Sequence, residues 1–299
     1  MYEYVLENKG LSLERLHLLC EVARAGGIKA AVGDDPTRQS LASRQLKELN
    51  EYVGVELCHR IGRSLEMTEA GRALTDIGND FFRKLESFLR STRNLPDKFS
   101  LGVGDSIFQW QILPKMKTFE QRFPTTQLVS YSYSANEIIQ KVESRTLDAG
   151  IVRKTAVHQP DLICESIGEI QYRLFIPPRL TQKTAKRGLA PSIKDIPFCT
   201  LTGDGEYAKA MTTFLSAFGG IPALNCSSMT QMYAAVQSGQ NAAVLPANAE
   251  TGISRTIARA YTLPELTPFT RQIALVYRHE TSTDTKKTEV IEFLRESIH

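Results

Sequence analysis

Residues Gln39 to Tyr52 read QSLASRQLKELNEY, and this stretch decides the fold of the N-terminal part of the chain. Its spacing predicts a helix with two unlike faces, because residues three and four positions apart lie on one side of a helix. Polar side chains share one face: Ser40, Ser43, Arg44, Lys47 and Glu51. Apolar side chains share the opposite face: Ala42, Leu46, Leu49 and Val53. The helix can therefore bury one side and present the other.

The polar face carries side chains that suit the major groove of duplex DNA. Gln39 can pair bidentately with adenine, the serine hydroxyls can contact several base edges, and Arg44 and Lys47 can reach guanine or phosphate. A solvated surface helix also presents charged residues outward. The elements around the helix must therefore decide between the two interpretations.

The preceding residues predict a helix-turn-helix. Ser12 is a suitable N-cap for a helix whose apolar stripe continues to Ala23, and Gly26-Gly27 ends it. Ile28 to Val32 predicts a short second helix, and residues 33–36 (GDDP) predict a turn. Thr37 or Arg38 would then lead into the helix of residues 39–52. Helix, short helix, turn and helix follow one another in the order of that motif.

The following residues predict a basic hairpin. Residues 57–60 and 64–67 read as two short strands, and Arg60 and Arg63 stand at the tip between them. Beside a recognition helix, such a hairpin is a wing whose arginines contact phosphates without reading sequence. An ordinary solvated turn accounts for the two arginines equally well.

Residues 69–94 predict one long helix, with Thr68 as its cap. Its apolar positions recur in steps of three and four, close to a heptad seam: Leu74, Ile77, Phe81, Leu85, Phe88 and Thr92. That pattern is typical of a helix that pairs with a second copy of itself. Leu95-Pro96-Asp97 ends the helix and marks a domain boundary.

Residues 12–72 resemble the winged helix-turn-helix of the LysR-type transcriptional regulators. The resemblance rests on a specific combination of motifs: Ala30-Ala31, Gln39-Ser40, Ser43-Arg44-Gln45-Leu46, Leu49, Gly54-Val55-Glu56-Leu57, Arg60, Gly62-Arg63 and Leu65 to Gly71. The chain departs from the family pattern in three places: Leu41-Ala42 stands where Ala-Leu is usual, Arg38 where Ser or Thr is usual, and Gly33-Asp34-Asp35 where helix two usually ends in apolar residues.

The second half alternates strand and helix, which indicates βαβ units and a parallel sheet. The expected strands are residues 100–104, 127–133, 147–152, 171–176, 198–201, 223–226, 242–245 and 273–277. The expected helices are residues 107–123, 137–144, 207–218, 229–238 and 288–297. We interpret Lys183 to Arg187, together with Ser192-Ile193-Lys194, as an exposed loop.

The resemblance extends to this half and implies a domain organisation for the whole chain. It implies an α/β protein with a winged helix-turn-helix (residues 1–68), a linker helix (69–96) and a periplasmic-binding-protein-like effector domain (97–299). That domain would have two lobes, lobe I of residues 97–167 and 268–299 and lobe II of residues 168–267. The implied partners are double-stranded DNA, a small-molecule effector between the lobes, and further copies of the chain, as a homodimer through residues 69–94 and a dimer of dimers. No cofactor is implied.

Polar residues follow the expected strands where the next helices begin, which is where open α/β sheets bind ligands. The candidate effector-binding residues are Asp105, Ser106, Ser134, Asn136, Thr202, Ser228 and Met229. The alternative for each polar residue is simple capping of the following helix. Asp105 would repel a carboxylate effector, so either it caps Ile107 or Phe108 and points away, or the effector is neutral or cationic. Arg153 and Lys154 favour an anion, and Glu206 opposes it.

The composition places the chain among globular proteins. It has 299 residues, 42% hydrophobic and 23% charged, with a net charge of +3. No apolar run is long enough to cross a membrane, and residues 1–10 have no features of a secretory signal, so we expect a cytoplasmic protein. Its five cysteines form no CxxC pair, which argues against structural zinc and a disulfide framework.

Two other functions compete with a ligand-responsive regulator. The first is redox sensing, because Cys199 and Cys226 fall on strands of the same lobe and can approach each other. The second is an enzyme or a plain ligand-binding α/β protein. The sequence shows no nucleophile elbow, GxGxxG or HExxH motif, and its five histidines are isolated, so we expect no enzyme.

Overall fold

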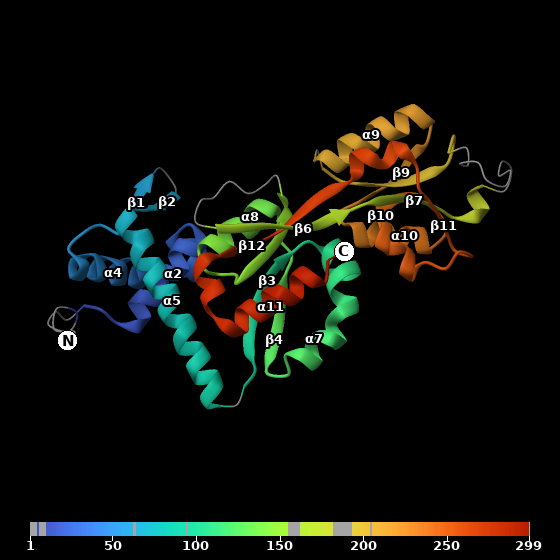
Figure 1. Ribbon diagram of the computed structural model, residues 1–299. Coiled ribbons are helices and arrows are strands. Elements are labelled where there is room, and N and C mark those ends of the chain that lie inside the picture. The colour runs from blue at the N-terminus through green and yellow to red at the C-terminus, as the bar shows by residue number, and fades with distance from the viewer. Residues whose placement is uncertain are drawn as a thin grey trace. The chain divides into compact units, whose positions relative to one another are not determined.

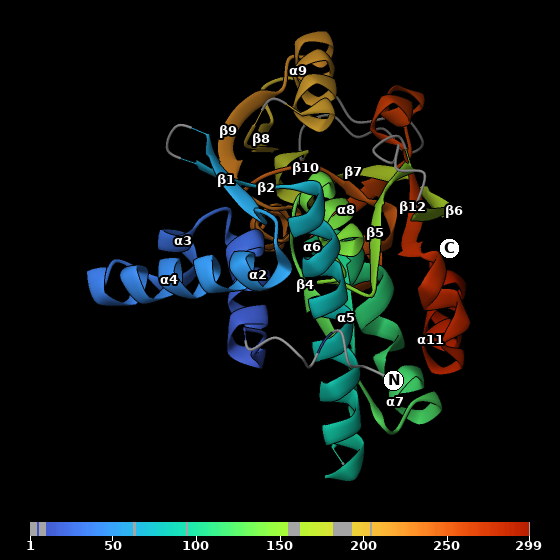
Figure 2. The same cartoon turned by 90° about the vertical axis from the view of Figure 1, so that its left-hand side faces the viewer.

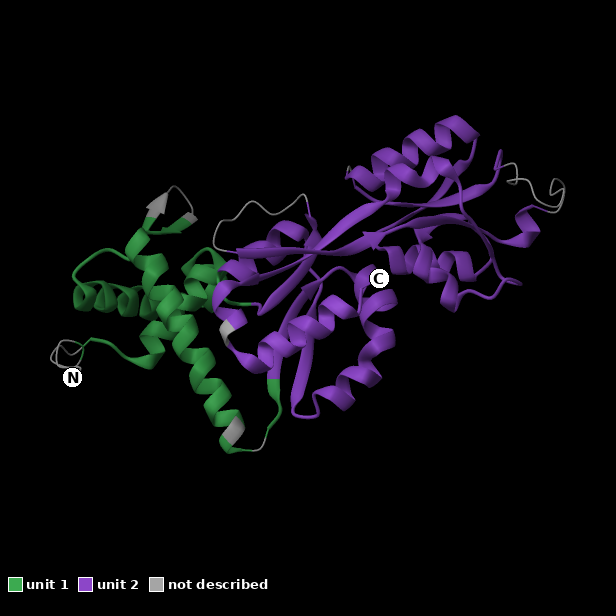
Figure 3. Ribbon diagram, in the orientation of Figure 1, with its two compact units in different colours: residues 1–97, 144–146 green, residues 98–143, 147–299 purple. Residues whose placement is uncertain are grey.

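The computed structural model describes residues 5, 10–61, 64–93, 95–154, 162–181, 193–203 and 205–298. The chain divides into two compact units, which Figure 3 colours separately. Unit 1 comprises residues 1–97 and 144–146, and unit 2 comprises residues 98–143 and 147–299. Figure 1 labels the elements of both.

Unit 1 is made of helices and one hairpin (Figure 2). In chain order its elements are α2 (Leu13–Ala25), α3 (Ile28–Val32), α4 (Pro36–Val53), β1 (Cys58–Ile61), β2 (Ser64–Met67) and α5 (Glu69–Thr92). As predicted, the Ser12 hydroxyl accepts the Arg15 N–H at the start of α2, and Gly26 ends that helix in the left-handed conformation. The predicted helix-turn-helix and hairpin are therefore confirmed.

Helix α4 begins earlier than predicted. Its N-cap is Asp35, whose Oδ1 accepts the N–H of Thr37 at 2.8 Å and of Arg38 at 3.4 Å. Pro36 occupies the first helical position, where its missing N–H costs nothing and its fixed φ suits a helix. Assigning the start to Thr37 or Arg38 was wrong because the proline that closes the turn also opens the helix.

The core of unit 1 joins α2, α4 and the hairpin. Its buried residues are Leu18, Leu19, Val22, Ala42, Leu46, Leu49 and Leu57. Val53, which was expected on the buried face of α4, is 37% exposed, because it is the last residue of the helix and the buried positions of α4 end at Leu49. Gly71 lies so close to Leu57 that a Cβ there would stand 1.8 Å from the Leu57 carbonyl oxygen. Only glycine allows α5 to begin against that backbone.

Lobe I of unit 2 is built on a five-stranded sheet of order β4-β3-β5-β12-β6. Its elements are β3 (Asp97–Val103), α6 (Asp105–Ile107), α7 (Met116–Arg122), β4 (Thr126–Tyr131), α8 (Ala135–Glu143), β5 (Ala149–Arg153), β6 (Leu162–Ile170), β12 (Arg271–Arg278) and α11 (Thr285–Glu296). Aromatic rings fill much of its core, with Phe119, Phe123 and Phe293 in mutual contact.

Lobe II combines a three-stranded sheet of order β10-β7-β11 with the parallel pair β8-β9. Its elements are β7 (Tyr172–Ile176), β8 (Pro197–Leu201), α9 (Glu206–Phe218), β9 (Ile221–Cys226), α10 (Met229–Gln237), β10 (Ala243–Pro246) and β11 (Arg259–Tyr261). A single bridge between Phe198 and Ala242 connects β8 to the start of the β10 segment. Its largest fully buried side chains include Phe175, Phe198 and Phe269.

The prediction of a parallel sheet was wrong in part. β3 and β5 run parallel, as do β8 and β9. In contrast, β12 is antiparallel to both β5 and β6, and β7 is antiparallel to both β10 and β11. β12 enters lobe I from lobe II, and so it runs against the strands that leave lobe I. The sequence analysis also missed β6 and β11. In β6 the polar residues Glu165 and Ser166 interrupt the apolar pattern by which a strand is recognised.

The predicted helix of residues 107–123 is broken into four short pieces. Between α6 and α7 the chain forms the π-helical turn η1 (Phe108–Ile112) and the 3-10 turn η2 (Leu113–Lys115). Pro114 lacks the N–H that a continuous α-helix needs at that position. The break places Trp110 against lobe II, where it packs in the core and its ring lies 5.5 Å from that of Tyr233.

The chain passes between the lobes twice. The first crossing is at Gln171, between β6 and β7, and the second is at Thr270, between η6 (Pro264–Phe269) and β12. Arg271 therefore stands at the first residue of a crossing strand.

Candidate DNA-binding surface and effector site

The outward face of α4 is exposed as predicted. Ser40, Ser43, Arg44 and Lys47 are all exposed, whereas Ala42, Leu46 and Leu49 are buried. The two cations make only loose ion pairs one turn along the helix, Arg44 with Glu48 and Lys47 with Glu51, each at 3.8 Å. Exposed pairs of this kind contribute little stability, so both cations are available to another anion.

Gln39 is already engaged within the protein. Its Nε2 donates to the carbonyl oxygen of Gly33 at 2.7 Å, across the turn between α3 and α4. Bidentate pairing with adenine would require the side chain to give up this bond, because the amide must donate and accept at the base edge. The hydrogen bond gives Gln39 a role in holding the turn that the sequence analysis missed.

The hairpin tip is described only in part. Arg60 lies in β1, where its backbone pairs with Leu65 of β2. Arg63 lies outside the described residues. Their contact with phosphates stays a prediction.

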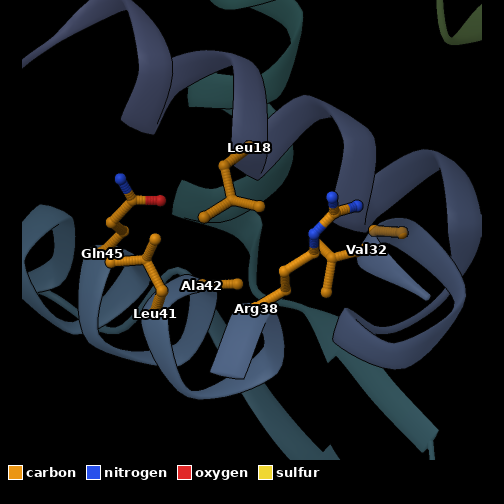
Figure 4. Close-up of a pocket in the computed structure, with 7 residues that line it drawn as sticks. Leu18, Val32, Arg38, Leu41, Ala42 and Gln45 are labelled. Atoms are coloured by element: carbon orange, nitrogen blue, oxygen red, sulfur yellow. The ribbon is translucent and has the colours of Figure 1, made fainter. Parts of the chain in front are cut away.

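A shallow hollow of about 310 Å³ opens between α2, α3 and α4 (Figure 4). It is lined by Leu18, Ala31, Val32, Arg38, Leu41, Ala42 and Gln45. We attribute this hollow to the order Leu41-Ala42, because the small side chain of Ala42 occupies the buried position and the large side chain of Leu41 the exposed one. A leucine at position 42 would point its isobutyl group toward the hollow.

The candidate effector residues of lobe I serve mainly local structure. Asp105 is the first residue of α6, but Gly104 is the N-cap and no side chain caps this turn, so the structure does not support the alternative in which Asp105 caps Ile107 or Phe108. Ser106 is the next residue of α6 and is partly exposed. Ser134 forms a capping box with Glu137, each accepting the other's backbone N–H, and Asn136 is exposed on α8.

The candidates of lobe II divide in the same way. The Ser228 hydroxyl caps α10 by accepting the Gln231 N–H at 3.2 Å. Met229 packs partly buried on the lobe II core. Thr202 is exposed, and its backbone N–H donates to the Cys226 carbonyl. The alternative of simple capping therefore accounts for Ser134 and Ser228.

Two family models match the chain and together cover nearly all of it. Residues 13–72 match the bacterial regulatory helix-turn-helix protein, lysR family, and residues 93–298 match the LysR substrate binding domain. The chain belongs to the LysR family. Its winged helix-turn-helix and its two-lobed C-terminal domain are the two parts that these models describe.

Relatives within the LysR family match over shorter stretches. The transcriptional activator CmpR of Synechocystis is 34% identical over 143 residues, 47% of each chain. A probable RuBisCO transcriptional regulator of Trichormus variabilis is 24% identical over 218 residues, 69% of this chain and 63% of the relative. This chain spans about a third to just over half the length of the first curated relatives it matches.

Solved LysR-family structures share the fold. A full-length OxyR variant from Pseudomonas aeruginosa has a TM-score of 0.60 at 15% identity and covers 97% of this chain and 95% of its own. LysG from Corynebacterium glutamicum, with arginine bound as effector, has a TM-score of 0.60 at 13% identity, covering 95% and 98%. CbnR in complex with its target DNA has a TM-score of 0.51 at 18% identity, covering 96% and 99%.

In this LysR-family chain, three charged residues that are far apart in the sequence form one cluster in the structure: Arg153, Glu206 and Arg271. Arg153 at the end of β5 donates to Glu206 Oε2 at 2.8 Å, and Arg271 Nε lies 3.4 Å from the same oxygen. Glu206 is the first residue of α9, so this cluster connects the two lobes. Arg271 was not predicted as a site residue, because nothing near it in the chain reveals that its side chain lies beside residues 65 and 118 positions away.

The two cysteines of the redox alternative lie on neighbouring strands, but their surroundings disfavour the reactive thiolate form. Both are buried free thiols on the paired strands β8 and β9. Burial raises the pKa of Cys199 to about 12, and the neighbouring thiol of Cys226 adds to the shift. Because thiolates are the reactive form, this environment favours packing over redox chemistry.

The described residues contain no helix able to span a membrane. Nor do they contain a group of three or more His, Cys, Asp or Glu side chains arranged to hold a metal ion.

Proposed function

We propose that this LysR-family chain is a transcriptional regulator that binds duplex DNA through the exposed face of α4. The observation that carries the proposal is the division of that helix, with Ser43 and Arg44 outside and Leu46 and Leu49 in the core. Serine and arginine are suited to base edges and phosphates, and the buried leucines fix the helix that presents them. We also propose a cytoplasmic location, because the protein would meet the proposed DNA partner there.

A gel shift with the DNA upstream of the protein's own gene tests this proposal. We expect Arg44→Ala to weaken binding about tenfold or more with the fold intact, because a charged contact to base or phosphate is lost. Arg122→Ala is a matched control, since Arg122 is a partly exposed, ion-paired arginine in unit 2. Equal binding by wild type and Arg44→Ala would contradict the proposed surface.

We further propose that α5 pairs with its copy in a homodimer, and that two dimers associate. Ile77 and Phe88 are 63% and 62% exposed, and Phe81 and Leu89 are exposed beside them on the same helix. A single helix seldom presents four large apolar side chains to water unless a partner covers them. A dimer would also place two recognition helices on successive half-sites.

Sedimentation of the full chain tests the dimer. We expect Phe88→Glu to shift the protein toward monomer, because it would bury a charge at the seam. Glu86→Gln, which changes the charge of an ion-paired residue on the opposite face of α5, should leave the oligomer unchanged. Retention of the wild-type mass by Ile77→Glu and Phe88→Glu together would rule out this seam.

The C-terminal unit is proposed to sense a small molecule between its lobes. An effector changes DNA binding only if it binds one arrangement of the lobes better than another. No cofactor is needed for this. Mass spectrometry of small molecules that co-purify with the full chain would identify candidates, and their addition to the gel shift tests them.

A further inference from the structure

We propose that Arg153 and Arg271 form an oxyanion-binding pair between the lobes, and that Glu206 is an internal carboxylate which the effector displaces. The inference rests on the proposed effector-binding function and specifies the chemistry of the ligand. The expected class is a small metabolite bearing a carboxylate, sulfonate or phosphate group. Asp105, which would repel an anion bound beside it, forms no ion pair with Arg153 or Arg271 in the described part of the chain, where both arginines pair with Glu206.

The first observation is a deficit of negative charge around Arg271. Its side chain is only 12% exposed, and its one carboxylate neighbour among the described residues is Glu206, at the long distance of 3.4 Å. The same Glu206 oxygen already accepts the closer hydrogen bond from Arg153. One carboxylate oxygen therefore serves two guanidinium groups, which leaves a largely buried positive charge without full compensation.

The second observation is a hydrogen-bond donor on the Arg271 guanidinium, Nη2, that is unpaired within the described part of the chain. Its Nη1 donates to the backbone carbonyls of Pro268 and Thr270, at 2.7 and 2.9 Å, which fixes the plane of the group. Its Nη2 is buried and has no hydrogen-bond partner among the described residues. Nε and Nη2 can together hold an oxyanion bidentately, and the carboxylate now nearest reaches only Nε.

A tyrosine adds a third group to this place. Burial raises the pKa of Tyr172, although the positive charges of Arg271 and Arg153 act in the opposite direction, so the phenol stays protonated at neutral pH. A phenol that stays protonated can donate to a bound oxyanion. Tyr172 follows the first lobe crossing, and Arg271 follows the second.

Glu206 is suited to being displaced. Its side chain is 63% exposed and belongs to the opposite lobe from Arg153 and β12. An exposed carboxylate contributes little as an ion-pair partner, and an arriving oxyanion can replace it without leaving a buried acid unpaired. The exchange would convert an interlobe contact within the protein into a contact through the effector.

The test is a titration of the full chain with acetate, methanesulfonate and inorganic phosphate, each against chloride at equal ionic strength. Trp110 is the only tryptophan of the chain and packs against Tyr233 across the lobes, so its fluorescence reports changes between them. The unfolding temperature is the second readout, and it records binding that leaves Trp110 unchanged. The three anions distinguish among the carboxylate, sulfonate and phosphate classes.

We expect at least one anion to give a saturable response in wild type. Glu206→Gln should lower its half-saturation at least tenfold, because the competing charge is removed while the size of the side chain is kept. Glu296→Gln is the matched control: Glu296 is 65% exposed and pairs with Arg122 on the surface of lobe I, and its loss should change nothing. Arg271→Gln and the more exposed Arg153→Gln should abolish saturation.

The proposal is overturned if no anion saturates either wild type or Glu206→Gln, or if Arg153→Gln binds as wild type does. Because Arg153 is exposed, its variant separates loss of the site from loss of the fold. The gel shift with Arg44→Ala fails or succeeds independently of these titrations. Anion binding without DNA binding would contradict only the proposed function. DNA binding without anion binding would contradict only this inference.

Discussion

Lys287 on α11 donates to Asp148 Oδ1 at 2.7 Å, and the other carboxylate oxygen accepts from both the N–H and the hydroxyl of Ser100. Asp148 is buried just before β5. This pair ties α11 to the central strands of lobe I, across 139 positions of sequence.

The Asp148 pair predicts a stability that depends on acid pH. Burial by itself raises the pKa of Asp148, but Lys287 and the Ser100 hydrogen bonds outweigh it, so the pKa is lowered. A lowered folded-state pKa means that the stabilisation is present above the unfolded value of about 3.9 and is lost as the pH falls through the folded value. Urea unfolding should show a smaller difference between wild type and Asp148→Asn at pH 3 than at pH 7.

At pH 7 we expect Asp148→Asn to lower the free energy of unfolding by about 2–4 kcal/mol, because it leaves Lys287 without its partner. Glu296→Gln, at the surface pair with Arg122, should cost no more than about 1 kcal/mol. A loss that is the same at both pH values would show that the charge of Asp148 is not what stabilises lobe I.

Filling the hollow beside α4 should stabilise unit 1. The double variant Leu41→Ala with Ala42→Leu restores the usual family order and moves the isobutyl group from the half-exposed to the buried one of two positions that line the hollow of Figure 4. We expect a gain of about 1 kcal/mol, seen as a higher unfolding temperature. Leu41→Ala alone should change stability by less than about 0.5 kcal/mol. A destabilised double variant would mean that the helices cannot accept the larger side chain.

Gly71 should not tolerate alanine. The added Cβ would meet the Leu57 carbonyl oxygen at 1.8 Å, and the backbone at this contact carries no flexible group that could give way. We expect Gly71→Ala to cost about 3 kcal/mol and to weaken DNA binding by displacing the hairpin from α5. Gly27→Ala is the control, since nothing lies within 4 Å of a Cβ there. Similar unfolding midpoints for the two variants would contradict the close contact.

The cysteines should react in an order set by burial. Cys164 is exposed, whereas Cys199 and Cys226 are buried. We expect iodoacetamide to label Cys164 in the native protein and to label Cys199 only on unfolding, because a pKa of about 12 leaves almost no thiolate at neutral pH. DNA binding should then be insensitive to peroxide. A disulfide between Cys199 and Cys226 in peroxide-treated protein would revive the redox alternative.

Features that depend on residues close together in the chain were predictable from the amino-acid sequence. The Ser12 and Thr68 caps, the buried positions of α4 and the hairpin all follow from spacing or from side chains within three residues of the backbone groups they serve. The start of α4 was misplaced by a few residues for a related reason. Pro36 fits both the end of a turn and the first position of a helix, and only the Asp35 hydrogen bonds decide between them.

The lobes of unit 2 were harder to predict because their order depends on distant segments. Periodicity finds a strand but not its partner, so the antiparallel placement of β12 was missed along with the polar-interrupted β6. Ser134 and Ser228 were chosen as ligand contacts from their positions after strands, and the structure shows that both cap helices.

From the sequence alone come the family, the helix that faces outward in unit 1 and the caps that begin its helices, because these depend on motifs and on contacts a few residues apart. Only the tertiary structure decided that Arg153, Glu206 and Arg271 meet and that Trp110 reaches across to Tyr233. Charge and ring contacts of this kind form when two chain crossings bring the lobes together, and no local pattern encodes the distance between residues so far apart.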